Sequence, residues 1–330
     1  MPKLPKPRGP LSELLFDALV EPPHAVRVRE PGDDEDLQLS LYVLYELHYR
    51  SFDGVADGWE WEPSVLALRA RLEADFEAAL RAEVGPLEAD GAVPELLEQA
   101  LAAGDGPPLS RYLECQASAE QFREFVVHRS AYQLKEADPH SWAIPRLAGA
   151  PKVALVEIQS DEYGGGRPER QHARLFADTM DALGLDPTYG AYLDRIPGVT
   201  LATVNLMSLC GLHRRLRGAI VGHLAALEMD STLPNRRYGN GLRRLGLEAA
   251  TEFYDEHVEA DAVHEALAAN DLAAAFAAAE PELAGDVVFG ARAMVKLDTA
   301  LATHIMDRWA RGESSLREPL PRGELRLRAS

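Results

Sequence analysis

The stretch that most constrains the fold is residues 252–265, which read EFYDEHVEADAVHE. It contains no glycine or proline and is rich in residues that favour helix, so it predicts an α-helix. Within it His257, Asp261 and His264 follow one another at spacings of four and three residues. At about 100° per residue, these side chains lie along one stripe of the helix. Two imidazoles and a carboxylate on one stripe are typical ligands of a divalent metal; the alternative is a solvated acidic helix face.

The composition limits the classes of protein to consider. The chain has 330 residues and a formal net charge of -19, which argues against nucleic acid and anionic membranes as partners. Neither Cys115 nor Cys210 belongs to a CxxC motif, as expected of a reduced cytoplasmic protein. No apolar run is long enough to cross a membrane, and the Pro-rich start lacks the apolar core of a signal peptide. We therefore expect a cytoplasmic location.

Most of the chain shows a helical pattern of apolar residues. The stretches with this pattern are 37–52, 62–84, 94–103, 118–136, 167–185, 201–227, 242–264, 266–279 and 287–311. Residues 152–158 fit either a strand or a buried helix. The sequence PNRRYGNG, residues 234–241, predicts a break between two helices. Because no alternation typical of a sheet appears, the expected fold is an all-α bundle.

The two ends of the chain differ in composition from the rest. Residues 1–35 are rich in proline and contain an acidic turn, so we expect a flexible arm there. The basic end, residues 313–330, is expected to be a loose tail. Residues 36–117 read as an N-terminal helical extension that precedes the part of the chain with candidate ligands.

Further metal ligands must come from other helices. A bundle core buries ionisable residues only when they are paired or bound to metal, so acids and histidines on apolar helix faces are the candidates. Glu136, His172 and Glu228 each lie among apolar residues of a predicted helix. Each one alone also fits a surface acid or a hydrogen-bonded core histidine.

A further carboxylate near His172 has two candidates. Glu169 stands three residues before it, the Glu-x-x-His spacing of ferritin-like diiron proteins. Glu162, in the sequence DEYGGG, is the alternative, because the glycines after it would let the chain bulge and turn the carboxylate inward. A phosphate cradle at these glycines lacks the surrounding P-loop or dinucleotide-binding pattern. Together the candidates form an inventory that can hold two iron or manganese ions.

In this order the residues resemble the ligands of the haem-oxygenase-like diiron oxidases and oxygenases, a group of iron-containing redox enzymes. These carry a Glu on one core helix, a Glu and a His around the second, a Glu on the third and H-x3-D-x2-H on the last. The residues that match are Glu136, Glu162, His172, Glu228, His257, Asp261 and His264. The resemblance covers residues 118–312, and its spacings are similar to those of the diiron domain of the streptozotocin-pathway N-oxygenase.

The resemblance implies a haem-oxygenase-like bundle with two bound iron ions, for which manganese could substitute, and O2 as co-substrate. Either Glu136 or Glu228 would bridge the ions, and Glu162 is expected as the extra carboxylate, with Glu169 as its alternative. A peroxo-diiron(III) species would oxidise a small molecule of specialised metabolism. The implied reactions are N-oxygenation, desaturation or C–C cleavage of an amine, amino acid or carboxylic acid. The resemblance leaves open whether an external electron donor is needed and whether the chain forms a homodimer.

Two other hypotheses use the same fold, and a third uses a related one. A haem-binding protein would need one proximal histidine early in the domain, and would show a Soret band. A non-catalytic metal-binding protein would tolerate loosely placed carboxylates and would consume no oxygen. A thiaminase-like hydrolase would need a nucleophilic cysteine, which neither Cys115 nor Cys210 supports.

Overall fold

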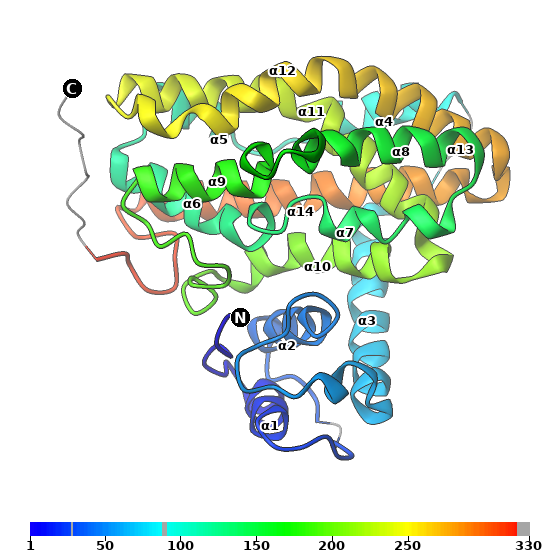
Figure 1. The fold of residues 1–330 in the computed structure, drawn as a ribbon, viewed down its shortest axis with the longest axis vertical. Helices are drawn as coiled ribbons and strands as arrows, with labels where there is room; N and C mark the ends of the chain where they lie inside the picture. Colours follow the sequence, from blue (N-terminus) through cyan, green and yellow to red (C-terminus); the bar gives the residue numbers. More distant parts are fainter. Residues whose placement is uncertain (28, 88–90, 322–330) are drawn as a thin grey trace.

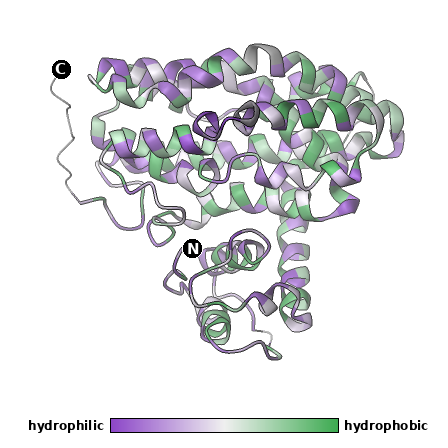
Figure 2. Cartoon of the chain, viewed as in Figure 1, coloured by the Kyte–Doolittle hydropathy of each residue, from purple (hydrophilic) through white to green (hydrophobic). Residues whose placement is uncertain are grey.

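The structure is a computed structural model that describes residues 1–27, 29–87 and 91–321; the side chains of 261–263 are also outside the description. The described residues are mostly helical and include no strand, so the predicted all-α class is confirmed. Figure 1 shows a layered bundle of long helices with a smaller N-terminal group of helices beneath it. Polar and apolar residues alternate in blocks along each bundle helix, as expected where one side packs inward (Figure 2).

The bundle contains most of the chain. Its longer helices are α6 (Ala119–Gln133), α8 (Gly149–Glu162), α9 (His172–Ala182), α10 (Gly198–Leu212), α11 (Arg217–Arg244), α12 (Glu252–Ala266) and α14 (Ala284–Ala310). Its shorter elements are α4 (Val93–Ala102), α5 (Leu109–Cys115), α7 (Asp138–Ser141) and α13 (Ala275–Ala279), which a π-helix, Leu267–Ala274, joins to α12. Among the described residues, no helix has the length and apolar character needed to cross a membrane.

Three helices precede the bundle: α1 (Pro10–Leu19), α2 (Asp34–Glu46) and α3 (Pro63–Val84). The prediction of a flexible arm is wrong for the segment that forms α1. Leu11, Leu15 and Leu19 recur every four residues on one face of it and are fully buried. The carboxylate of Asp36 accepts hydrogen bonds from the backbone N–H groups of Leu11 and Ser12 and so caps this helix. Proline content therefore underestimates the order of this segment.

A buried ion pair joins the N-terminal helices to the bundle. Lys135 Nζ lies 3.0 Å from Glu46 Oε2, and the two side chains are 1% and 0% exposed. The same Glu46 oxygen accepts a hydrogen bond of 2.7 Å from Tyr189 Oη. A charge buried this deeply is stable only when its partner is present, so the pair fixes α2 against the turn that follows α6.

The long helices of the second half differ from the predicted boundaries. The apolar stretch 201–227 is divided between α10 and α11, with a turn after Leu212. The break predicted at 234–241 is wrong, because α11 continues through Pro234 to Arg244. Tyr238 and Leu242, beyond the proline, are buried, and this packing holds the helix together despite the lost backbone donor. Residues 152–158 lie within helix α8.

Helices α11 and α14 are in backbone contact. A Cβ atom on Gly222 would overlap the carbonyl oxygen of Val287, and one on Gly290 would overlap that of Ala219. Only glycine allows such an approach.

The start of the expected loose tail is packed against the bundle: Leu316 is 2% exposed and Ser315 Oγ donates to Glu124 Oε2 at 2.7 Å. Residues 322–330 of that tail lie outside the described residues.

Candidate metal centre

Six of the seven predicted ligand residues meet inside the bundle. They form two groups in which the possible ligand atoms all lie within 4.8 Å of one another. All six side chains are buried. The first group is Glu136, Glu162, His172 and His257, and the second is Glu162, Glu228 and His264. The turn after α6 and the helices α8, α9, α11 and α12 therefore bring these six side chains to one place.

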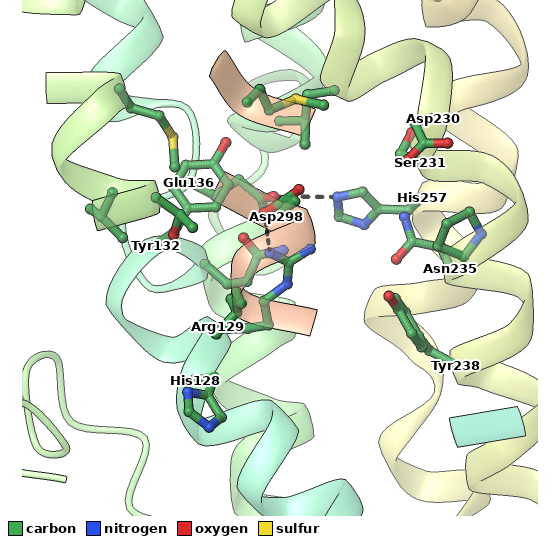
Figure 3. Close-up of a pocket in the computed structure, with 18 of the residues that line it drawn as sticks. His128, Arg129, Tyr132, Glu136, Asp230, Ser231, Asn235, Tyr238, His257 and Asp298 are labelled. Carbon is green, nitrogen blue, oxygen red and sulfur yellow. Dashed lines mark ion pairs between the residues drawn. The ribbon is translucent and has the colours of Figure 1, made fainter. Parts of the chain in front are cut away.

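The first group combines carboxylates and imidazoles from four positions. His172 Nδ1, at the first residue of α9, lies 2.8 Å from Glu162 Oε2, at the last residue of α8. His257 Nε2, on α12, lies 3.6 Å from Glu136 Oε1 and faces it across the site (Figure 3). Nitrogen and carboxylate oxygen donors of this kind suit iron, manganese and zinc.

The second group shares Glu162 with the first. His264 Nδ1, two turns after His257 on α12, lies 3.4 Å from Glu228 Oε2 on α11. Glu162 is the carboxylate common to both groups, whereas the sequence leads us to expect Glu136 or Glu228 in the bridging position. The difference arises because Glu162 stands at a helix end between the two histidine-bearing segments, a position that spacing along the chain does not reveal.

One predicted ligand candidate lies outside the described residues, and another lies away from both groups. The side chain of Asp261 falls outside the described residues, so its role as a ligand stays a prediction. Glu169 lies in the short 3-10 helix Pro168–Arg170, is exposed, and belongs to neither group. Of the two carboxylates considered beside His172, Glu162 is the one that the structure brings to it.

The glycines after α8 place Glu162 beside His172. Gly164 has a φ of 78°, in the left-handed region that favours glycine. A Cβ at this position would lie 2.7 Å from the backbone carbon of Arg170 and from the nitrogen of Gln171. The chain therefore crosses itself closely at Gly164, and this crossing returns the start of α9 to the end of α8.

Glu136 lies in the turn that follows α6. The next residue, Ala137, has a φ of 73°, an unusual value for a residue with a side chain. Its carbonyl oxygen accepts a hydrogen bond of 2.7 Å from Gln159 Nε2, and Lys135 is fixed by its pair with Glu46. The turn is thus held on both sides of Glu136. Such strain is commonly found at functional sites.

Outer hydrogen bonds orient both α12 histidines. His257 Nδ1 lies 2.8 Å from the carbonyl oxygen of Phe253, so this nitrogen donates and Nε2 faces Glu136. His264 Nε2 lies 3.1 Å from Asp161 Oδ2, which directs Nδ1 toward Glu228. Such outer partners fix the tautomer and ring orientation of metal-binding histidines. Sequence reasoning missed Asp161; the only signal for it was an acid next to Glu162.

Burial makes the ionised carboxylates costly without a cation. It raises the pKa of Glu136, an effect that His257 opposes, and it raises the pKa of Glu228, which His264 opposes. Burial alone would lower the pKa of His264, but its contact with Glu228 outweighs this and raises the value to about 9. Glu136 Oε2 is buried and, within the described part of the chain, makes no hydrogen bond. These features fit a site that binds metal cations.

A cavity of about 270 Å³ borders the site. Glu136, Glu162, Glu228 and His257 form part of its wall. The rest is largely aromatic and aliphatic, with Tyr132, Tyr238, Tyr254 and Phe125 among the lining residues. Residues 107–110, which precede and begin α5, also line it. A small organic molecule could therefore lie directly beside the candidate ligands.

A helical bundle with buried carboxylates and imidazoles in two adjoining groups is suited to holding metal ions. The model of the iron-containing redox enzyme family, which is haem oxygenase-like, matches residues 123–299, so the chain belongs to that family. Membership identifies the protein as an iron-containing oxidoreductase. No curated protein matches the chain, and the likeness of its spacings to one N-oxygenase stays a prediction.

Proposed function

We propose that this protein is a non-haem diiron oxidase or oxygenase that uses O2 to oxidise a small organic molecule. The observation that supports this most directly is that Glu162 belongs to both groups of candidate ligands. A carboxylate shared in this way would hold two ions close together, as in other two-metal sites. Family membership supports iron as the metal.

The two groups would divide the ligands between two ions. Glu136, His172 and His257 would hold one ion, and Glu228 and His264 the other, with Glu162 common to both. Asp261 is proposed to complete the second set. The donors are carboxylate oxygens and imidazole nitrogens, and no cysteine belongs to either group among the described residues. This chemistry suits ferrous iron, with manganese as a substitute.

Iron bound in this site would supply the electrons that O2 chemistry requires. The chain itself contributes position and environment. Phe253 and Asp161 hold the histidine rings, and the buried carboxylates keep their oxygens directed inward. The aromatic walls of the cavity exclude water and place an organic substrate beside the site. The substrate would be an amine, an amino acid or a carboxylic acid of specialised metabolism. The enzyme would oxidise it in the cytoplasm.

Anaerobic loading with Fe(II), removal of unbound metal and metal analysis test the proposal. We expect two iron ions per chain and, on rapid mixing with O2, an absorbance change in the visible range together with oxygen consumption. Loading with Mn(II) should give the same stoichiometry. Purified protein with a Soret band, binding of a single ion, or oxygen uptake no faster than that of free iron would contradict the proposal.

A further inference from the structure

The N-terminal helices contribute a set of side chains that surrounds one residue next to a candidate ligand. The family model begins to match at residue 123, so α1, α2 and α3 lie outside the part of the chain that it covers. Figure 1 shows these helices beneath the bundle. Lys135 stands directly before Glu136, in the turn after α6. The contacts that hold Lys135 therefore bear on the position of Glu136.

The ammonium group of Lys135 is enclosed mainly by residues of the N-terminal part. Besides its ion pair with Glu46, its Nζ lies 4.2 Å from the ring centroid of Tyr49 and 5.0 Å from that of Tyr42. Glu46 is itself held by the hydroxyl of Tyr189. A buried ion pair and cation–π contacts stabilise the structure only while their partners are in place. Lys135 therefore ties the turn to α2 and to the segment that follows it.

A second contact from the N-terminal part lies on the other side of Glu136 in the sequence. Arg50 Nη2 lies 3.8 Å from Oδ2 of Asp138, which stands two residues after Glu136. Both side chains are partly exposed, so this ion pair is the weaker of the two. Glu136 therefore stands between two residues, Lys135 and Asp138, that contact the N-terminal part.

Helix α8 holds the same turn through other atoms. Gln159 Nε2 donates to the carbonyl oxygen of Ala137, and Tyr163, directly after the helix, donates its hydroxyl to Asp138 Oδ1 at 2.9 Å. Helix α8 ends with Glu162, the carboxylate common to both ligand groups. The turn is therefore fixed by one element that belongs to the candidate metal centre and by another that does not.

The turn needs such contacts because its own backbone does not hold it in a regular helix. Helix α6 ends at Gln133, and Ala137 has a positive φ. A residue with a side chain keeps such a φ only where its surroundings fix it. Glu136 is 6% exposed and faces His257, so relaxation of the turn would move a buried carboxylate away from its imidazole partner. Contacts that fix the turn therefore fix the candidate ligand.

We propose that Glu46 and Lys135 are positioning residues of the metal centre, through which the N-terminal helices fix the Glu136 ligand. This assignment rests on the proposed function and concerns one of its two ions. Glu136 belongs to the first ligand group only, whereas Glu228 and His264 belong to the second. Loss of the ion pair weakens the binding of the first ion and spares the second.

Titration of a chelator against the full-length protein, loaded anaerobically with Fe(II), tests the assignment. Lys135→Met keeps an unbranched side chain and removes its charge. The variant is made in two backgrounds, His264→Ala, which should keep only the first ion, and His257→Ala, which should keep only the second. We expect at least about tenfold weaker binding in the first background and a change of less than about twofold in the second. Equal effects in both backgrounds, or none in the first, overturn the assignment.

A double variant separates positioning from stability. Lys135→Met leaves Glu46 buried without a cation, which destabilises the fold, whereas Glu46→Gln combined with Lys135→Met leaves neither charge. We expect the melting temperature of the double variant to return toward that of the wild type. Its first ion should stay at least about tenfold weaker, because an amide and a thioether do not replace a charged hydrogen bond. Recovery of the first ion together with the melting temperature means that the pair is only structural, and overturns the assignment.

Arg8→Met is the matched control in the N-terminal part. The Arg8 side chain is 1% exposed, pairs with Glu35 at 2.9 Å and donates to the carbonyl oxygens of Leu193 and Ile196, before α10. Loss of this attachment should lower the melting temperature and leave the binding of both ions unchanged. Selective weakening of the first ion by Arg8→Met would assign the effect to the N-terminal part as a whole, and would overturn the specific role of Glu46.

Hydrogen exchange of the metal-free protein keeps the two proposals separate. The backbone N–H of Lys135 donates to the carbonyl of Tyr132, and that of Asp138 donates to the carbonyl of Lys135, so both amides report on the turn. We expect Lys135→Met to speed their exchange at least about tenfold and to leave α11 and α12 unchanged. Unchanged exchange in the turn overturns the assignment even if two ions bind. Faster exchange in the turn, with fewer than two ions bound by the wild-type protein, would remove the diiron function and leave the hold on the turn standing.

Discussion

The carbonyl oxygen of Phe253 lies 2.8 Å from Nδ1 of His257, one turn later on α12. This contact assigns the proton to Nδ1 and directs the lone pair of Nε2 toward Glu136, 3.6 Å away. A main-chain acceptor cannot be removed by mutation of its side chain, so the orientation of this ring depends on the helix itself. The metal binding that we propose for His257 therefore depends on an intact α12.

Iron stoichiometry should distinguish the shared carboxylate from the other ligands. Glu162→Ala should lose both ions because Glu162 belongs to both groups, whereas His257→Ala and His264→Ala should each retain one ion. Metal analysis after anaerobic loading measures this, and circular dichroism should show nearly unchanged helix content. Glu169→Ala, at an exposed position outside both groups, is the control. Retention of both ions by Glu162→Ala would show that another residue bridges the site.

The outer partner of His264 should affect only one of the two ions. Asp161→Asn weakens the hydrogen bond that holds the His264 ring, and loss of such a partner typically lowers metal affinity by about 10–100-fold. We expect the second ion to be lost first when a chelator is titrated against the loaded variant. Glu157→Gln, exposed on the same helix, should behave as the wild type. Parallel loss of both ions would mean that Asp161 acts on the whole site.

The close crossing at Gly164 should be sensitive to a single methyl group. Gly164→Ala forces a Cβ to 2.7 Å from the backbone of Arg170 and Gln171, whereas Gly165→Ala has a similar positive φ but open space. We expect Gly164→Ala to lower the free energy of unfolding by roughly 1–3 kcal/mol more than Gly165→Ala. Urea unfolding of both variants measures the difference. Equal costs would mean that the loop moves away without resistance.

Acid should destabilise the metal-free protein through His128. Burial lowers the pKa of this histidine to about 3 from its ordinary 6.5, while its ring nitrogens contact Thr200 and Ser315. The unfolded chain takes up the proton first, so stability present above pH 6.5 is lost as pH falls toward 3. At pH 5 the loss is about 2 kcal/mol, which is 1.5 pH units at about 1.4 kcal/mol each.

His128→Gln should remove this part of the pH dependence. Urea unfolding at pH 7 and pH 5, with a chelator present, should show a smaller decrease between the two values in the variant than in the wild type. His24→Gln, at an exposed position, should leave the decrease unchanged. An unaltered decrease in His128→Gln would assign the acid sensitivity to other groups.

The sequence predicts the class of fold because helix periodicity and helix-forming residues agree along most of the chain. It also indicates six candidate ligands that the structure brings together, since acids and histidines on apolar helix faces are rarely buried unless they are paired or bound to metal. The choice between Glu162 and Glu169 requires the path of the chain through Gly164, which no local pattern contains. The sharing of Glu162 by both groups is hidden from the sequence for the same reason.

Other features depend on contacts between distant segments. The order of α1 comes from Asp36 and from apolar packing, neither of which is visible in its proline content. Pro234 predicts a break, although packing beyond it keeps α11 continuous.

The glycine contact between α11 and α14 has a consequence for the range of molecules that the protein can accept. The two helices that touch at Gly222 and Gly290 both contribute residues to the cavity wall, and no side chain separates them at the contact. Each methyl group added at the contact would push the two helices apart and so move a whole wall of the cavity. Substrate size in this scaffold can therefore be altered by engineering at two positions that no substrate touches.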